Sequence, residues 1–385
     1  MNSPTAFVKN IPDLVALVRE FKKSNNKVAE ARKYISKELI YTYAQDDRFI
    51  RESKKFLRKY FKGYSDVRWH ILYAALSGIK SPEYIPYDLW ITLIEPQLNP
   101  PDMAKAYCDK NIYDKIFNYR YLPKTIARIY NNTICDPHYN PISLHEFYKK
   151  IENQSSKIVM KPTFLENSGR GRNVKILQNS EIKNIITTIP KNENWIFQEY
   201  IEQHDEMAQY HPGSINTLRV MTINISGEYR LLTTILRVGV NDTNVDNIGA
   251  GGIYVGVYSD GYLRSFGLDK NYTKYYNHPN TNIKFGGKKI PDFDKVIALV
   301  TQLHRYLYNF KVVSWDIAIM QNAEPLVIEY NLYEVIIRQQ FCNGPLLSPY
   351  THDILSQINR PHYFNIGISK LLDIHRNVSF LKMKR

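Results

Sequence analysis

Trp315-Asp-Ile-Ala-Ile319 and Leu326-Val-Ile-Glu-Tyr-Asn331 are two neighbouring stretches that place acidic and amide side chains inside otherwise apolar runs. Because side chains alternate along a strand, Glu329 and Asn331 share one face of the second stretch. We expect two adjacent strands that present oxygen ligands from Asp316, Glu329 and Asn331 to one point. Such oxygens suit a hard cation such as Mg²⁺, held together with nucleotide phosphates. A structural ion pair is the alternative, because a carboxylate in an apolar strand needs a partner.

A second segment has the composition of a phosphate-binding region. Lys157-Ile-Val-Met-Lys161 predicts an apolar strand that ends in a lysine, and the loop Ser168-Gly-Arg-Gly-Arg172 follows it. Glycines allow backbone amides to approach a phosphate closely, and Arg170 and Arg172 add positive charge. The P-loop pattern is missing from this loop. The alternative to a phosphate-binding loop is a turn with solvated charges.

Two further predicted strands carry polar groups. Gln198-Glu-Tyr-Ile201 ends an apolar strand and can offer backbone groups to a purine edge, although an ordinary core strand has the same pattern. Thr217 and Arg219 share a face of a later strand. A buried Arg219 would suit a phosphate or a carboxylate. The alternative is an arginine paired with Asp or Glu across the sheet.

The organisation of the chain changes along its length. Residues up to about 80 predict helices, among them one at roughly Lys27 to Tyr43 and one at Asp47 to Phe61. The stretch from Lys80 to Pro101 contains five prolines, and strands dominate from Lys157. We expect the proline-rich stretch to be a linker or an irregular crossing segment. Of the 17 glycines, only Gly63 and Gly78 precede residue 169. This pattern predicts a helical N-terminal part followed by an α+β part with much antiparallel sheet.

Composition and charge narrow the classes of protein. The 385 residues are 44% hydrophobic and 23% charged, which is ordinary for a soluble chain with a core. No run of about 18 apolar residues predicts a spanning helix, and the first residues do not resemble a secretory signal. The formal net charge is +14, and half of this excess lies in residues 1–60. It predicts either solvated helical faces or a surface for an anionic lipid or polymer.

Taken in order, the motifs resemble those of the ATP-grasp superfamily, and most closely its sugar-transfer-associated branch. The resemblance covers roughly residues 105–350. The matching pieces are Asp109-Lys110, Leu122-Pro123, Lys161-Pro162, Ser168 to Gly171, Gln198 to Ile201, Asn216 to Arg219, Gly249 to Gly252, Trp315-Asp316-Ile-Ala318 and Ile328 to Asn331. It implies an α+β fold in which two lobes clamp ATP, with a helical N-terminal region. The corresponding domains are residues 1–104, 105–202 and 203–385.

The resemblance also implies roles for individual residues. Lys110 and Lys161 would contact nucleotide phosphates, and a loop would close over them. Arg219 would steady the transferred phosphoryl group. Mg²⁺ would be held by Asp316, Glu329 and Asn331. The loop residues are Ser168, Gly169, Arg170 and Gly171. The adenine-lining residues are Gln198, Glu199, Tyr200 and Ile201, with Glu199 as the principal partner, and Glu202 would reach the ribose. Arg338 departs from the family pattern, and we interpret it separately as a candidate clamp for an acceptor carboxylate.

The chemistry that the resemblance implies is two-step amide formation. A carboxylate takes the γ-phosphate of ATP to become an acyl phosphate, and an amine then displaces the phosphate. The expected function is therefore an ATP- and Mg²⁺-dependent carboxylate–amine ligase. The branch suggests that an amino acid is joined to a uronic acid or an amino sugar in polysaccharide biosynthesis.

Two other functions fit the same residues. One is a phosphotransferase that passes phosphate to a sugar or a lipid carrier, and the other is a basic nucleic-acid-binding protein with an inactive nucleotide lobe. We expect ATP and carboxylate and amine substrates as partners, and no nucleic acid. The predicted location is cytoplasmic, with peripheral contact at the inner face of the membrane through the basic chain ends as a further hypothesis.

Overall fold

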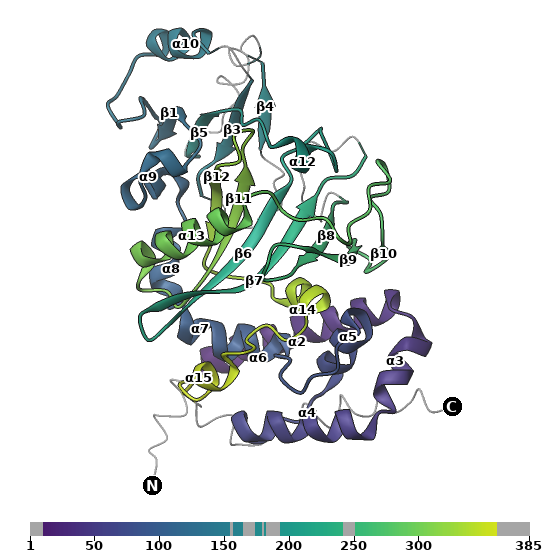
Figure 1. The fold of residues 1–385 in the computed structure, drawn as a ribbon. Coiled ribbons are helices and arrows are strands. Elements are labelled where there is room, and N and C mark those ends of the chain that lie inside the picture. Colours follow the sequence, from purple (N-terminus) through teal and green to yellow (C-terminus); the bar gives the residue numbers. More distant parts are fainter. Residues whose placement is uncertain are drawn as a thin grey trace. The chain divides into compact units, whose positions relative to one another are not determined.

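The computed structural model describes residues 11–154, 157–164, 174–178, 181, 193–241 and 251–359. The chain divides into two units (Figure 1). Unit 1 comprises residues 1–100, 271–274 and 333–385, and unit 2 comprises residues 101–270 and 275–332. Within the described ranges, no helix combines the length and apolar character needed to cross a membrane.

Unit 1 is helical in its described part. Its helices are α2 (Ile11–Tyr34), α3 (Lys37–Ala44), α4 (Asp47–Tyr60), α5 (Arg68–Ser77), α6 (Tyr87–Leu89), α7 (Glu95–Leu98), α14 (Ile337–Asn343) and α15 (Thr351–Leu355), with a π-helical turn at Trp90–Ile94. Helix α5 is the centre of this unit because eight consecutive side chains, from Trp69 to Leu76, are buried. Segments distant in sequence meet here, since Gln340 of α14 hydrogen-bonds both backbone groups of Ile85.

The proline-rich stretch is irregular over residues 80–86, whereas the sequence predicted a linker or irregular segment over its whole length. From Tyr87 the prediction was wrong. The stretch contains α6, the π-helical turn and α7, and Leu89 and Trp90 are fully buried. Pro86 is the N-cap of α6, Pro96 lies in the first turn of α7 and Pro101 begins α8 (Pro101–Tyr107). At an N-cap and at the first position of a helix, as for Pro86 and Pro101, proline costs no helical hydrogen bond. Pro96 instead lies inside the continuous helical run of residues 87–98, directly after the π-helical turn.

Unit 2 contains two antiparallel sheets. The five-stranded sheet has the order β2-β1-β5-β3-β4, with β1 (Thr125–Tyr130), β2 (Thr133–Cys135), β3 (Ile158–Pro162), β4 (Lys175–Leu177) and β5 (Trp195–Glu199). Helix α10 (Leu144–Glu152) covers one face, where its Phe147 and Ile151 pack against Met160 and Phe197. Short helical turns at Lys110–Ile112 and Tyr119–Tyr121 and helix α9 (Tyr113–Ile116) precede this sheet.

The larger sheet has the order β10-β9-β8-β7-β6-β11-β12. Its strands are β6 (Thr217–Ile225), β7 (Glu228–Val238), β8 (Ile253–Val257), β9 (Leu263–Leu268), β10 (Lys274–Tyr275), β11 (Val312–Ile319) and β12 (Pro325–Asn331). Helix α13 (Phe293–His304) packs its apolar stripe on one face, against Val220, Val313 and Trp315, and a short turn at Arg305–Leu307 follows it. The opposite face of β6, β7, β11 and β12 carries the charged residues.

The two sheets are joined through residues 200–204 and a four-residue helix, α12 (Asp205–Ala208). The backbone of His204 donates to Ile319 at 2.8 Å, and Gln203 forms a bridge with Met320 at the end of β11. The buried Gln203 side chain also bonds the carbonyls of His211 and Ser214 and accepts from Asn216. The connection is therefore anchored to the larger sheet immediately after the smaller one ends.

Candidate active site

The predicted cation-binding strands, β11 and β12, are neighbours in the larger sheet. They pair antiparallel, with Asp316 opposite Glu329 and Ser314 opposite Asn331. Strand β6 lies on the other side of β11 and places Arg219 opposite Asp316. The register therefore brings these charged side chains to one face of three adjacent strands, as expected from side-chain alternation.

Both carboxylates are engaged in ion pairs in this structure. Arg219 bonds Asp316 through Nε to Oδ1 at 2.5 Å and through Nη2 to Oδ2 at 2.8 Å, and Arg237 of β7 reaches Oδ2 at 3.0 Å. Burial would raise the pKa of Asp316, but the two guanidinium charges outweigh this effect and lower the pKa. The Lys110 ammonium lies 3.0 Å from Glu329. The cross-strand pairing of Arg219 is thus the alternative that its sequence context left open.

Lys161 is the most unusual cation of the site. It ends β3, is only 7% exposed, and donates to the Ile328 carbonyl of β12 at 3.5 Å. Burial lowers the pKa of Lys161 to about 8, and the nearby positive charge of Lys110 contributes in the same direction, against the attraction of Glu329. A bound anion beside this ammonium would favour its charged form and so offset the cost of burial.

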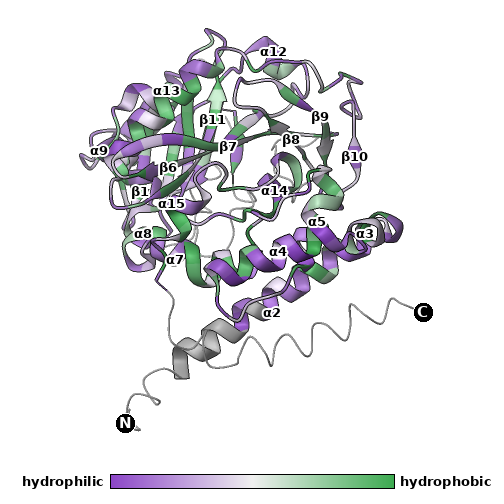
Figure 2. Ribbon diagram, turned by 60° about the horizontal axis from the view of Figure 1, so that its bottom comes forward, coloured by the Kyte–Doolittle hydropathy of each residue, from purple (hydrophilic) through white to green (hydrophobic). Residues whose placement is uncertain are grey.

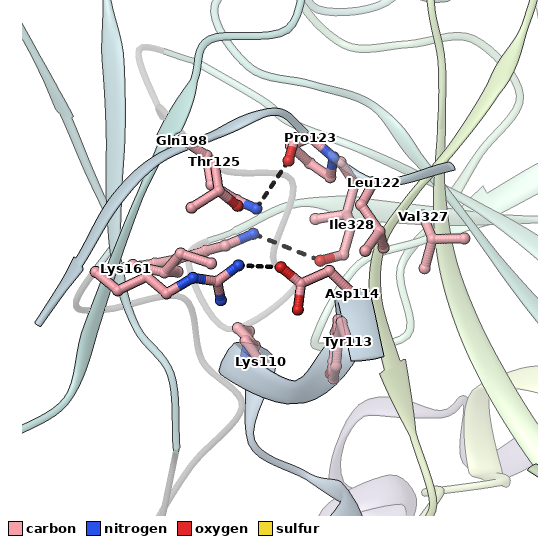
Figure 3. Close-up of a pocket in the computed structure, with 12 residues that line it drawn as sticks. Lys110, Tyr113, Asp114, Leu122, Pro123, Thr125, Lys161, Gln198, Val327 and Ile328 are labelled. Atoms are coloured by element: carbon pink, nitrogen blue, oxygen red, sulfur yellow. Dashed lines mark hydrogen bonds and ion pairs between the residues drawn. The ribbon is translucent and has the colours of Figure 1, made fainter. Parts of the chain in front are cut away.

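Lys110 and Lys161 line a pocket between the smaller sheet and β12, drawn in Figure 3. The space between these residues is about 280 Å³ when the open solvent at its mouth is included. Gln198 of β5 projects into it and donates to the Pro123 carbonyl at 3.1 Å. Its buried Oε1 accepts no hydrogen bond from any residue that the structure describes. Arg128 and Asp114, an ion pair, complete the polar lining. The pocket thus combines an apolar wall with a few convergent polar groups.

The residues fit a nucleotide and a hard cation. Asp316, Glu329 and Asn331 carry oxygen atoms of the kind that Mg²⁺ prefers, and the strand register places Asp316 opposite Glu329. Among the described residues, no group of three or more His, Cys, Asp and Glu side chains is arranged to hold a metal ion. Lys110 and Lys161 provide the matching positive charge for phosphates.

The other predicted adenine-lining residues follow Gln198 at the end of β5. Glu199 is ion-paired with Lys124 at 2.6 Å, and its backbone donates to the Lys124 carbonyl. Tyr200 donates its backbone N–H to Lys157, whose ammonium lies over its ring. Ile201 is partly buried, and the Glu202 carbonyl accepts from the backbone of Gln321 at 3.2 Å.

The remaining predicted residues lie elsewhere. Ser168, Gly169, Arg170 and Gly171 are outside the described residues. Arg338 is in unit 1, on α14, where its charge acts on Tyr87 and Tyr272.

Sequence reasoning did not find Arg237. This residue lies on β7, opposite Thr217 of β6, and bonds the Thr217 hydroxyl as well as Asp316. Its sequence signal is a single charge in the otherwise apolar or neutral run from Leu231 to Val238. The same signal singled out Asp316.

A family model for sugar-transfer associated ATP-grasp proteins matches residues 92–356. The chain belongs to this family. The predicted fold class, an α+β ATP-grasp-like fold with a helical N-terminal region, is confirmed. No curated protein sequence matches the chain significantly.

Several solved structures resemble this ATP-grasp chain. D-cycloserine synthetase DcsG is 11% identical, with 67% of this chain and 71% of that chain covered and a TM-score of 0.39. D-alanine–D-alanine ligase from Bacillus anthracis is 14% identical, with 70% of this chain and 71% of that chain covered and a TM-score of 0.36. The ATP-grasp ligase PsnB, solved with a phosphomimetic variant of its minimal precursor, Mg and ADP, is 13% identical, with 70% of this chain and 66% of that chain covered and a TM-score of 0.39.

Proposed function

We propose that this chain is an ATP- and Mg²⁺-dependent carboxylate–amine ligase that forms an amide through an acyl phosphate. The strongest support is that cations and carboxylates are paired within one unit. Lys110 pairs with Glu329 and Arg219 with Asp316, and Lys161 reaches the backbone of the strand that carries Glu329. Asp316, Glu329 and Asn331 would hold Mg²⁺, which neutralises phosphate oxygens when bound. Family membership supports the same assignment.

The proposed reaction has two steps. An oxygen of the substrate carboxylate attacks the γ-phosphorus of ATP, and the bond to the β-phosphate oxygen breaks, giving an acyl phosphate and ADP. The amine nitrogen then attacks the acyl carbon, phosphate leaves, and the nitrogen loses a proton. The cations Lys110, Lys161 and Arg219 stabilise charge on the transferred group, and no protein nucleophile is required.

The proposed substrates are an amino acid and a uronic acid or an amino sugar of polysaccharide assembly, because the family is associated with sugar transfer. The test is ADP release with a panel of amino acids, uronic acids and amino sugars, followed by product mass. An amide product has lost water relative to its two substrates. A product that has gained a phosphate supports the phosphotransferase instead. Absence of both turnover and thermal stabilisation by MgATP contradicts an ATP-dependent enzyme.

The variant Glu329→Gln tests the proposed Mg²⁺ ligand in the same assay. It removes one proposed Mg²⁺ ligand and the partner of Lys110 while keeping the side-chain size. We expect loss of ADP release at unchanged protein concentration and a folded far-UV spectrum. Equal turnover by this variant would contradict the assignment of Glu329.

We further propose that unit 1 contacts an anionic membrane surface through α4. The helix carries six basic and two acidic residues, and its buried side consists of Phe49, Ser53, Leu57 and Tyr60. The basic side chains Arg48, Arg51, Lys55, Arg58 and Lys59 are exposed, and the helix is predominantly hydrophilic in Figure 2. Each basic group near such a surface contributes about 1 kcal/mol.

Vesicle co-sedimentation tests this contact. The full chain should bind phosphatidylglycerol-containing vesicles and not phosphatidylcholine vesicles, and Arg51→Glu with Arg58→Glu should abolish binding. Stronger, steeply salt-dependent binding to random DNA than to the anionic vesicles would favour the nucleic-acid hypothesis.

A further inference from the structure

Arg128 is a buried cation of the smaller sheet, and its two terminal nitrogens have different partners. The residue lies on β1 and is 1% exposed. Its Nη1 donates to the backbone carbonyl of Asn111 at 3.0 Å and to the side-chain Oδ1 of the same residue at 3.2 Å. Its Nη2 pairs with the Asp114 carboxylate. The planar guanidinium therefore ties β1 to two points of a single short segment.

That segment carries Lys110. Lys110 begins the short helical turn Lys110–Ile112, and Asp114 lies in α9 directly after it. The backbone N–H of Lys110 donates to the carbonyl of Thr163, which follows the end of β3, at 2.9 Å. The turn is therefore held to the end of β3 by a backbone bond and to β1 by the Arg128 side chain.

Tyr139, in the loop after β2, contacts the same two partners as Arg128. Its hydroxyl contacts the Asn111 carbonyl and lies 2.5 Å from Oδ1 of Asp114. The Arg128 guanidinium and the Lys115 ammonium lie over its ring, 4.3 and 4.2 Å from the ring centroid. The backbone φ of Tyr139 is 68°, in the left-handed region that is unfavourable for an aromatic residue. Backbone strain of this kind persists only where surrounding contacts fix it, and here the strained residue is the one that supplies the hydroxyl.

The cluster formed by Asn111, Asp114, Arg128 and Tyr139 reaches the proposed nucleotide site at Lys110. Lys110, Asp114 and Arg128 line the pocket of Figure 3. A lysine ammonium sits on a flexible four-carbon side chain, so its placement depends on how firmly its own backbone is held. A small displacement of a group that contacts a reacting ligand is costly for the reaction.

We infer that Arg128 is a positioning residue of this site, which acts through Asn111 and Asp114 on the turn that carries Lys110. Tyr139 has the same role through its hydroxyl. The inference rests on the proposed function, in which Lys110 contacts nucleotide phosphates. A guanidinium suits this task better than an ammonium, because its fixed fork reaches two partners at once. Loss of Arg128 should therefore weaken recognition of the phosphates and leave recognition of the adenosine part unchanged.

Calorimetry with MgADP and with adenosine separates these two parts of the ligand. Arg128→Gln should weaken MgADP binding about tenfold, the value of one charged hydrogen bond, and change adenosine binding less than about twofold. Tyr139→Phe should weaken MgADP binding by a smaller factor. Arg120→Gln and Tyr130→Phe are the matched controls, because both side chains are exposed, and neither should change either affinity.

A double-mutant cycle with Lys110→Met tests whether Arg128 acts through Lys110. If it does, Arg128→Gln should cause no further loss of MgADP affinity once residue 110 is methionine. Losses that add in the double variant would show that Arg128 acts independently of Lys110, and they overturn the inference. Equal weakening of MgADP and adenosine by Arg128→Gln, or unchanged MgADP affinity in that variant, also overturns it. Full wild-type affinity in Arg128→Lys contradicts the need for two bonds.

A measurement without ligand separates the inference from the proposed function. Lys110 is 6% exposed, and its acetylation, followed by peptide mass, should rise about fivefold in Arg128→Gln because the turn opens more often, whereas acetylation of Lys161 should not change. Unchanged acetylation of Lys110 in a variant with a folded circular dichroism spectrum overturns the inference. If Arg128→Gln does not fold, Tyr139→Phe takes its place, since it removes a single hydroxyl. If the wild type binds neither MgADP nor adenosine while the acetylation responds as expected, the proposed function fails and the positioning of Lys110 stands.

Discussion

Lys161→Met should stabilise the ligand-free protein while abolishing nucleotide binding. Lowering the pKa of Lys161 from 10.5 to about 8 costs the protonated lysine about 3 kcal/mol, mainly through burial. At pH 7 the side chain still carries its charge, so the folded state bears this cost. Methionine has a similar length and no charge, and it loses only a 3.5 Å hydrogen bond to Ile328 and the attraction of Glu329. We therefore expect a net gain of about 2 kcal/mol in the free energy of unfolding.

The assay is urea unfolding at pH 7, with and without MgADP. Stability of the wild type should also rise between pH 8 and 10.5, because the unfolded lysine binds more protons than the folded one in that window. The Met variant lacks this component. Lys175→Met on β4, an exposed position of the same sheet, should change stability by less than about 0.5 kcal/mol. A less stable Lys161→Met protein, or one that MgADP still stabilises like the wild type, would refute the reasoning.

Three further predictions concern groups outside the proposed nucleotide-binding site. Burial raises the pKa of Glu95 to about 8, so the folded protein holds a proton there that the unfolded chain has lost, and stability falls as pH rises towards that value. Urea unfolding of the wild type should show the free energy of unfolding fall by about 2 kcal/mol between pH 6 and 8, and Glu95→Gln should remove this fall. Burial lowers the pKa of His304 to about 4, so the wild type should lose about 2 kcal/mol as pH falls from 6.5 to 4.5, and His304→Gln should flatten that slope. Gln203→Leu should cost about 4 kcal/mol, because four buried hydrogen bonds of its amide are lost, and guanidinium unfolding measures this. An unchanged midpoint in any of these comparisons contradicts the corresponding assignment.

The sequence predicted the local part of the site and missed its non-local part. Alternation places Glu329 and Asn331 on one face whatever the rest of the fold does, so the pairing of β11 with β12 followed from two short stretches. Arg237 is different, because it meets Asp316 only through the intervening strand β6. The register of β6 on β7 shifts between Met221 and Thr222, and such an irregularity has no reliable signal in a single sequence.

Helix limits also depend on local sequence, whereas the packing of the helices depends on residues far apart in the chain. The limits predicted for α4, Asp47 to Phe61, differ by one residue from Asp47–Tyr60, because local capping decides them: the Asp46 side chain accepts from the backbone of Phe49. The prediction of one helix from Lys27 to Tyr43 was wrong, since Ser36 caps a new helix there. The placement of residues 333–359 with the N-terminal helices depends on contacts such as Gln340 with Ile85, which are separated by 255 positions.

Asp316 and Glu329 should oppose the binding of a free anion in the ligand-free protein and support the binding of MgADP in the proposed complex. Substituting either carboxylate should therefore change these two affinities in opposite directions. In the free protein Glu329 pairs with Lys110, and Asp316 pairs with Arg219 and Arg237. Removing either carboxylate charge therefore makes the site more positive. Anions other than nucleotide should then bind better. In the proposed complex the same oxygens hold Mg²⁺, so their removal should weaken MgADP. A variant such as Glu329→Gln that gains affinity for free phosphate while losing MgADP would show both roles in one side chain, whereas a structural ion pair alone predicts no gain for either ligand.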